Sequence, residues 1–174
     1  ALDGYLDDYA YLIQGLLDLY EASFNASYLE WTLTLQHKQD ELFWDPKAGG
    51  YFSTAGNDPN ILMRIKDDYD GAEPSPNSVS AMNLLRLWQL TDNPEYRERA
   101  EKTLDAFSKM MSDSPSAVPQ MLATLDFFLD KPKQIVIAGK PGSKDTLAML
   151  RAIQTKFVPN KIVILADGGA GQKA

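Results

Sequence analysis

One helical pattern occurs twice in this sequence, at an interval of 68 residues, the separation of Asn25 from Asn93. The matching residues cover two helical runs and the turn between them: Leu16, Leu17, Leu19, Asn25, Tyr28 and Glu30 correspond to Leu84, Leu85, Leu87, Asn93, Tyr96 and Glu98, and Tyr20 corresponds to Trp88. A match at constant offset over this length indicates a duplicated helical hairpin. We therefore expect two copies of one hairpin to pack side by side.

The two helices of each hairpin differ in hydrophobic pattern. Apolar residues recur at steps of three and four over residues 9–24 and nearly all round the run 79–90, so these first helices are expected to be buried on several sides. The second helices, after Asn25 and Asn93, have one apolar face, and the later one is expected to run to Met111. A helix buried on several sides followed by a helix with one apolar face fits an inner and an outer layer of helices, arranged concentrically. We predict a mainly α fold, an α/α toroid with parallel inner helices and outer helices running back.

The pattern changes twice outside the repeat. Near the end of the sequence, β-branched runs at 134–138 and 161–166 flank a helix expected over about 144–156, so we expect a β-α-β unit with parallel strands. A further helix is expected over 121–129, before this unit. The predicted organisation is a helical-hairpin domain over 1–131 with a β-hairpin-like insertion at 44–66, followed by a small α/β appendage over 132–174.

An acidic loop, residues 67–78, lies directly before the first helix of the second hairpin and contains four carboxylates, a tyrosine and two prolines. Such a loop at a helix start either caps the helix or faces a ligand. The 68-residue shift places Asp7 and Asp8 on Ser75 and Pro76. We therefore expect both acidic segments at one end of the toroid, on the rim formed by the N-terminal ends of the inner helices.

Two carboxylates on this rim are expected to face each other across the gap between helices. Packed helices lie about 8 to 10 Å apart, and carboxylates separated by roughly 6.5 to 9.5 Å leave room for a water between acid and base, as in inverting glycoside hydrolysis. We predict Glu73 as the general acid and Asp8 or Asp70 as the base. The residues expected to contact a ligand are Asp7, Tyr9, Trp44, Tyr69 and Asn77.

Each of these assignments has a purely structural alternative. The acidic residues are equally compatible with helix capping, and the aromatic ones with core packing, which we expect for Trp88. The loop aspartates lack the twelve-residue spacing of a calcium site, so no metal is predicted. His37 is expected at the surface, on the polar side of a one-faced helix. The turn Gly139–Ser143 lacks the glycine spacing of a phosphate-binding loop, and no cofactor is expected.

Composition argues against several classes of partner. The chain of 174 residues has a net charge of -7 and no basic run longer than a pair, which disfavours nucleic acid. Its longest apolar runs are too short to cross a bilayer, so no membrane span is expected. The sequence has no cysteine, so it forms no disulfides. This leaves the cellular compartment of the protein undetermined, and we expect the cytoplasm. The start at Ala1, close to a helical pattern, predicts a piece of a longer protein.

Four motifs carry a resemblance to a known family, in this order: Leu6-Asp7-Asp8-Tyr9-Ala10, Glu41-Leu42-Phe43-Trp44-Asp45, Gly49-Gly50-Tyr51-Phe52 and Asp68-Tyr69-Asp70-Gly71-Ala72-Glu73-Pro74-Ser75. They resemble the C-terminal part of the thioredoxin-domain-containing family that includes the spermatogenesis-associated thioredoxin-like proteins and bacterial YyaL-type proteins. The resemblance implies a thioredoxin-like domain followed by a six-hairpin toroid similar to that of glycosidases and of N-acylglucosamine 2-epimerase. Pro76 replaces the glycine usual in the family, and it fits the first turn of a helix.

The resemblance makes this chain a partial (α/α)6 toroid that lacks the thioredoxin-like domain and the first half of the ring. We expect it to bind or process a carbohydrate-like ligand at the rim, with an activity similar to that of a glycoside hydrolase or a sugar epimerase. The alternative is a non-enzymatic structural or redox-linked interaction module whose partner is the thioredoxin-like domain. In either case, inner helices without neighbours expose apolar walls, so self-association of the piece is expected.

Overall fold

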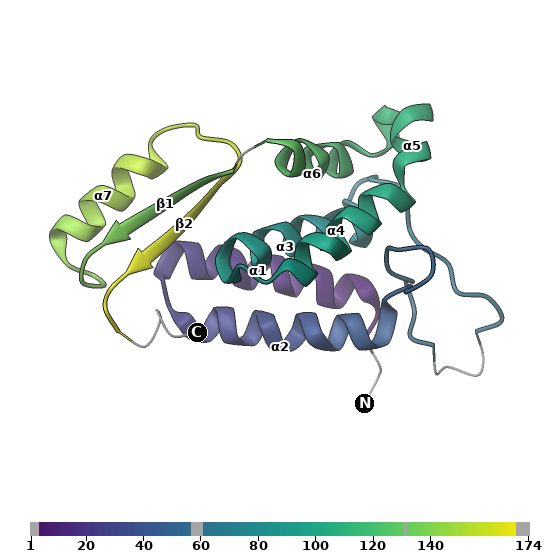
Figure 1. Cartoon of the computed structure of the whole chain (residues 1–174), viewed down its shortest axis with the longest axis horizontal. Helices are drawn as coiled ribbons and strands as arrows, with labels where there is room; N and C mark the ends of the chain where they lie inside the picture. The colour runs from purple at the N-terminus through teal and green to yellow at the C-terminus, as the bar shows by residue number, and fades with distance from the viewer. Residues whose placement is uncertain (1–3, 57–60, 131, 170–174) are drawn as a thin grey trace.

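The computed structural model describes residues 4–56, 61–130 and 132–169, and within them the protein is mainly helical with a small parallel sheet (Figure 1). The helices are α1 (Leu6–Ser23), α2 (Ala26–Phe43), α3 (Pro76–Thr91), α4 (Pro94–Ala106), α5 (Ser108–Asp113), α6 (Pro119–Leu129) and α7 (Lys144–Gln154), with a 3-10 turn, η1, at Pro115–Ala117. The strands are β1 (Lys133–Ala138) and β2 (Lys161–Ala166). The expected mainly α fold with a small β-α-β unit is confirmed.

The two repeats form hairpins that share the same turn. Phe24 ends α1 at φ 55°, and its counterpart Asp92 ends α3 at φ 57°, both in the left-handed region. Asn25 and Asn93 then cap the next helices, each accepting a hydrogen bond of 3.1 Å from the backbone N–H two residues later. The duplicated hairpin predicted from the sequence is therefore confirmed down to the backbone of its turn.

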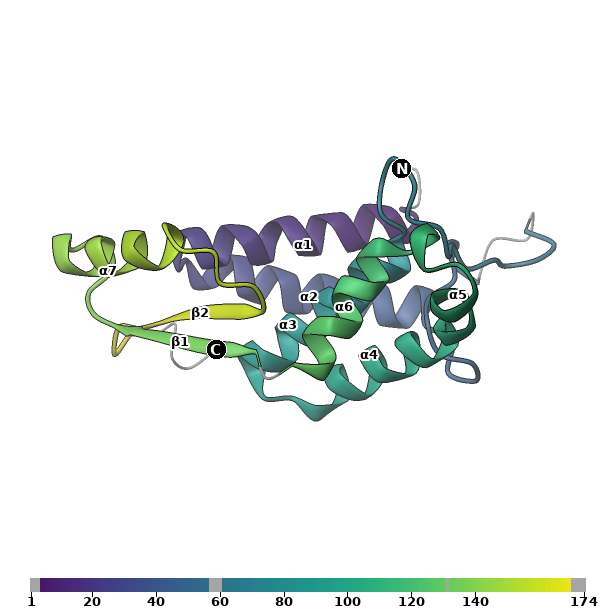
Figure 2. The same ribbon diagram turned by 90° about the horizontal axis from the view of Figure 1, so that it is seen from above.

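The first helices of the two hairpins lie side by side and run in the same direction (Figure 1 and Figure 2). Asn83 of α3 donates to the carbonyl of Ala10 at 2.8 Å, and Arg86, one turn later, pairs with Glu21 further along α1. Because the contacts advance in the same order along both helices, α1 and α3 begin at the same end of the molecule.

The helix α6 continues this arrangement on the other side of α3. Its first turn reaches the acidic loop, where the backbone N–H of Gln120 donates to Asp70 at 2.8 Å. One turn later, the hydroxyl of Thr124 donates to the carbonyl of Ser78 at 3.3 Å. The helices α1, α3 and α6 thus start at one end of the molecule, and we call this end the rim.

The appendage is joined to the helical body through its second strand. β1 and β2 pair in parallel with Lys133 opposite Lys161, as expected for a β-α-β unit. Ile162 is fully buried in the main core, in one cluster with Leu6 and Leu85. The α/β appendage and the helical domain therefore share a core. The boundary that we placed between residues 131 and 132 adjoins residue 131, which lies outside the described residues.

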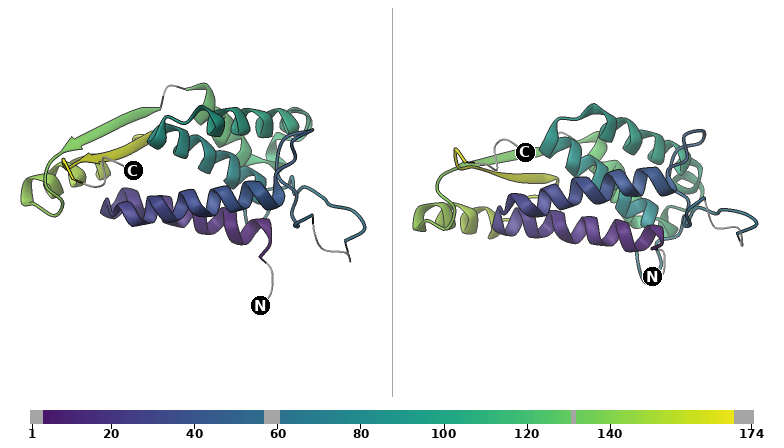
Figure 3. Two further views of the ribbon diagram at one scale, coloured as in Figure 1. Left: turned by 60° about the horizontal axis from the view of Figure 1, so that its bottom comes forward. Right: turned by 90° about the horizontal axis from the view of Figure 1, so that it is seen from below.

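Two local expectations need revision. The single helix expected to run to Met111 is interrupted at Phe107, whose backbone (φ -103°, ψ 6°) separates α4 from α5 while its ring is buried beside Met121. In the stretch 44–66, the described residues contain one isolated antiparallel bridge, between Trp44 and Tyr51, and otherwise irregular backbone. Figure 3 shows this loop extending from the end at which α1 begins.

Replacing Ile162 by alanine tests whether the appendage and the helices unfold together. Because Ile162 fills the shared core, we expect a loss of about 2 to 5 kcal/mol in the free energy of unfolding, in a single transition followed by circular dichroism in urea. Val136→Ala, at an exposed position of β1, is the control, with a loss below about 0.5 kcal/mol. A small early transition for Ile162→Ala would show instead that the appendage unfolds separately.

Candidate functional site

The rim contains a small cavity between the beginnings of α1 and α3. Its volume is about 210 Å³, and it is lined by Tyr5, Leu6, Asp7, Ser53, Asp67 and Pro76. The lining comes from three segments far apart in the sequence: the start of α1, the loop after α2, and the acidic loop. The structure therefore brings together the two acidic segments that the sequence repeat placed at one end.

Tyr11 is the residue around which the acidic side chains of the rim gather. Its hydroxyl donates to the carbonyl of Pro74, which joins α1 to the acidic loop. Burial raises the pKa of the Tyr11 phenol, and the negative charges of Glu73, Asp7, Asp70 and Asp67 raise it further. We did not identify Tyr11 from the sequence, although it lies one helical turn after Asp7 and so shares its face.

Asp8 and Asp70 are engaged with backbone N–H groups. Asp8 turns back on its own helix and accepts from the N–H of Tyr5 at 2.9 Å. Asp70 is buried, and it accepts from the N–H groups of Ser75 at 2.7 Å, Gln120 at 2.8 Å and Met121 at 3.2 Å. The first N–H groups of a helix have no partner within it, so these carboxylates satisfy donors that would otherwise be unpaired.

The remaining acidic candidates face solvent. Glu73 is exposed, and it makes no hydrogen bond or ion pair with any other residue that the structure describes. Asp7 is also exposed, and among the described residues its one hydrogen bond comes from the neighbouring backbone N–H of Asp8, at 3.0 Å. The ring of Tyr69 is 63% exposed and lies over Gly71. These three side chains are accessible to a ligand at the rim.

The other predicted ligand contacts lie deeper in the protein. Asn77 is fully buried, accepting from the N–H of Tyr51 at 2.7 Å and donating to the carbonyls of Tyr51 at 3.0 Å and Asp67 at 3.1 Å. Its amide therefore holds the loop after α2 against the acidic loop.

The aromatic candidates also pack inward. Tyr9 and Trp44 are partly buried against the main core, making edge-on ring contacts with Phe43 and Tyr51 at centroid distances of 5.5 Å and 5.1 Å. Trp88 packs against the same core, as expected.

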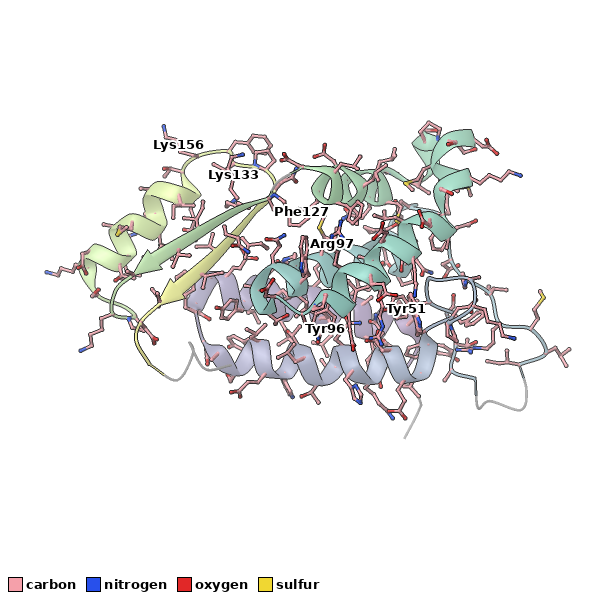
Figure 4. The ribbon with its side chains drawn as sticks, viewed as in Figure 1. Tyr51, Tyr96, Arg97, Phe127, Lys133 and Lys156 are labelled. Carbon is pink, nitrogen blue, oxygen red and sulfur yellow. The ribbon has the colours of Figure 1, made fainter. Side chains whose placement is uncertain are left out.

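A second cluster of ionisable groups lies between α2 and α4 and was not predicted from the sequence. The Asp40 carboxylate accepts from the Tyr51 hydroxyl at 2.6 Å and from the Gln36 amide at 2.9 Å, and it is paired with Arg99. It borders a cavity of about 490 Å³ lined by His37, Asp40, Glu41, Asn93, Glu95, Tyr96 and Arg99. His37 is exposed there, as expected. Figure 4 shows Tyr51 and Tyr96 near α2 and α4.

Comparison with known proteins identifies relatives over almost the whole chain. Its homologues are named spermatogenesis-associated protein 20. The mouse protein is 52% identical over 166 residues and the human protein 49% identical over 166 residues, in each case 95% of this chain. An uncharacterized protein of Caenorhabditis elegans is 35% identical over 158 residues, or 91% of this chain. The chain spans 21% of the length of each of these relatives. No family model matches it.

These relatives confirm the spermatogenesis-associated part of the resemblance, whereas the thioredoxin-like domain and the toroid stay predictions. Within residues 4–56, 61–130 and 132–169, no helix combines the length and hydrophobicity that crossing a bilayer requires. The same residues contain no group of three or more acidic or histidine side chains arranged to hold a metal ion.

The pKa of Asp40 provides a test of the buried cluster. Burial raises this pKa above 3.8, although Tyr51, Arg99 and Gln36 act to lower it. The folded state therefore binds the proton more tightly than the unfolded state. This contribution to stability is complete below about pH 4 and is lost as the pH rises through the raised pKa.

We expect Asp40→Asn, which carries no charge at any pH, to remove this dependence. Its free energy of unfolding relative to the native sequence should increase as the pH rises above about 4, measured by urea denaturation at each pH. Asp113→Asn, at the exposed end of α5, should follow the native sequence. An unchanged difference between Asp40→Asn and the native protein over this range would contradict the burial of a charged Asp40.

Proposed function

We propose that this chain is a sector of an α/α toroid within a longer protein, and that its rim binds a carbohydrate-like ligand. The observation that carries the proposal is the common start of α1, α3 and α6, which gathers acidic side chains from α1 and the acidic loop around Tyr11. Sugars are typically bound by carboxylates and exposed aromatic rings, and the rim presents both, in Glu73, Asp7 and Tyr69.

The repeat supports the toroid because it indicates that a neighbour is missing on α1. In α3, Asn83 and Leu87 are fully buried against α1 and its hairpin. The positions 68 residues earlier are Gly15 and Leu19, and both are exposed, Leu19 by 48%. If each hairpin packs on the previous one in the same way, the outer face of α1 receives a preceding hairpin. The relatives, of which this chain spans 21%, have ample length to supply it.

The same geometry supports roles for individual carboxylates. Glu73 is the only one of the three predicted catalytic residues that is free of hydrogen bonds within the described chain, so it is our general acid, protonating the leaving oxygen of a glycosidic bond. Asp8 is the general base, taking a proton from the attacking water, because it is exposed and its bond to Tyr5 uses one of its two oxygens. Asp70, with three backbone partners, is expected to keep the rim in shape.

Glu73→Gln and Asp8→Asn in the full-length protein test the rim directly. If a saccharide found by a glycan array or thermal-shift screen is hydrolysed, each variant should lose turnover by about a hundredfold or more, the usual effect of removing an acid or base. Asp113→Asn is the control, with unchanged turnover. Unchanged turnover together with unchanged saccharide binding in both variants would remove these residues from any active role.

A non-enzymatic interaction module is the second candidate, and the engagement of Asp8 and Asp70 with backbone N–H groups favours it. In that case the acidic rim only caps helices, and the partner is the thioredoxin-like domain. The same saccharide screen distinguishes the enzyme from the interaction module. No saccharide should stabilise an interaction module, and Glu73→Gln should then change neither its stability nor its binding of ligands.

The exposed face of α1 gives a separate test of the toroid. Leu12 and Leu19 are 49% and 48% exposed and lie on one side of the helix, so we expect this chain to self-associate through them. The double variant Leu12→Lys, Leu19→Glu should shift the protein toward monomer in gel filtration at about 100 μM, a concentration at which a contact with a dissociation constant of about 10 μM is mostly formed. The control is Leu62→Ser, which removes an exposed leucine in the loop after α2. A native chain that is already monomeric would contradict the expectation.

A further inference from the structure

A cavity lies where the appendage meets the helical body, away from the rim. It has a volume of about 630 Å³ and is lined by Met82, Phe127, Gln154, Thr155, Lys156, Phe157, Val158, Pro159, Asn160 and Lys161. Small-molecule sites commonly have volumes of about 300 to 1,000 Å³, occur between structural units, and combine apolar walls with a few polar groups. This cavity has all three properties.

Both walls of the cavity are fixed in place. Met82 comes from α3 and Phe127, almost fully buried, from α6. The opposite wall is the loop from Gln154 to Lys161, which connects α7 to β2. Asn160 in this loop donates to the carboxylate of Asp126 on α6 at 2.8 Å, and Ile162, just beyond it, is anchored in the main core. The cavity is therefore formed without a ligand.

An uncovered aromatic ring lies at its mouth. Phe157 is 94% exposed, although it lines the cavity. Burying such a side chain against a ligand removes apolar surface from water and so stabilises the complex. With Met82 and Phe127 inside and Phe157 at the edge, the cavity offers an apolar surface that continues to the solvent.

Two lysines lie beside this apolar surface, and a third is close to one of them. Lys156 and Lys161 line the cavity, and Lys133 is paired with Lys161 in the parallel sheet. Figure 4 shows Lys133, Lys156 and Phe127 around the junction of α6 with the appendage. The nearby carboxylates of Asp126 and Asp130 both accept from the amide of Asn160. The chain as a whole has a net charge of -7, whereas here three lysines outnumber the two nearby carboxylates.

We propose that the cavity binds a small amphipathic anion, a carboxylate or sulfonate attached to an acyl chain or aromatic ring. The apolar body lies against Met82, Phe127 and Phe157, and the anionic group pairs with Lys156 at the mouth. Lys161 is placed to assist, since among the described residues its ammonium group donates one long hydrogen bond, of 3.3 Å, to the carbonyl of Val158. This proposal is independent of the ligand proposed for the rim.

The probe for this site is anilinonaphthalene sulfonate, an aromatic anion that fluoresces in apolar surroundings. We expect Lys156→Glu and Phe157→Ser each to weaken its binding about tenfold, the loss that corresponds to one charged contact or one buried ring. The matched controls are Lys144→Glu at the start of α7, with the same change in net charge, and Leu62→Ser, which removes another fully exposed apolar side chain. Both controls should bind the probe as the native chain does.

Competition identifies the chemistry of the ligand. Decanoate should displace the probe at a concentration at least about tenfold lower than decanol or decyltrimethylammonium, which have the same chain without the negative charge. Equal displacement by all three would overturn the proposal, as would undetectable probe binding or an equal loss in Lys144→Glu. If Leu12→Lys, Leu19→Glu abolishes the fluorescence and Lys156→Glu leaves it unchanged, the probe binds the flank of α1 and the proposal also fails.

Discussion

The buried carboxylate of Asp70 is the contact on which the arrangement of the rim depends. It accepts hydrogen bonds from the acidic loop and from the first turn of α6, two segments about fifty residues apart. Because the first N–H groups of α6 have no partners within their helix, this carboxylate satisfies two of them and holds the start of the helix against the acidic loop. Asn77 has a similar role for the loop after α2. The shape of the rim thus depends on buried polar side chains that form their hydrogen bonds with backbone groups of the protein itself.

This explains which parts of the structure were predictable from the sequence. The repeat predicted the two hairpins, their parallel first helices and even the equivalence of Asn25 and Asn93, because periodicity and capping are local signals. The direction in which an acidic side chain points is decided by distant backbone. The sequence alone therefore left capping and ligand contact equally open for Asp70, and the structure shows it bonded to α6.

The partly buried pair of Asp40 with Arg99 illustrates the same limit. Arg99 lies on α4, 59 residues from Asp40, and the Tyr51 hydroxyl that completes the cluster comes from an irregular loop. No spacing in the sequence marks these residues as neighbours. Likewise, the break at Phe107 coincides with burial of its ring in one cluster with Met121 of α6, and helical periodicity does not encode such packing between elements.

The position of Ile162 in the main core has a consequence for synthesis of the protein. This residue belongs to the same cluster as Leu6, near the opposite end of the described chain. On the ribosome, the early helices therefore emerge long before the strand that completes their packing. Until that strand is released, the apolar surface of α1 and α3 that it buries is exposed. We therefore expect chaperones that recognise exposed hydrophobic segments to bind the nascent polypeptide at this stage.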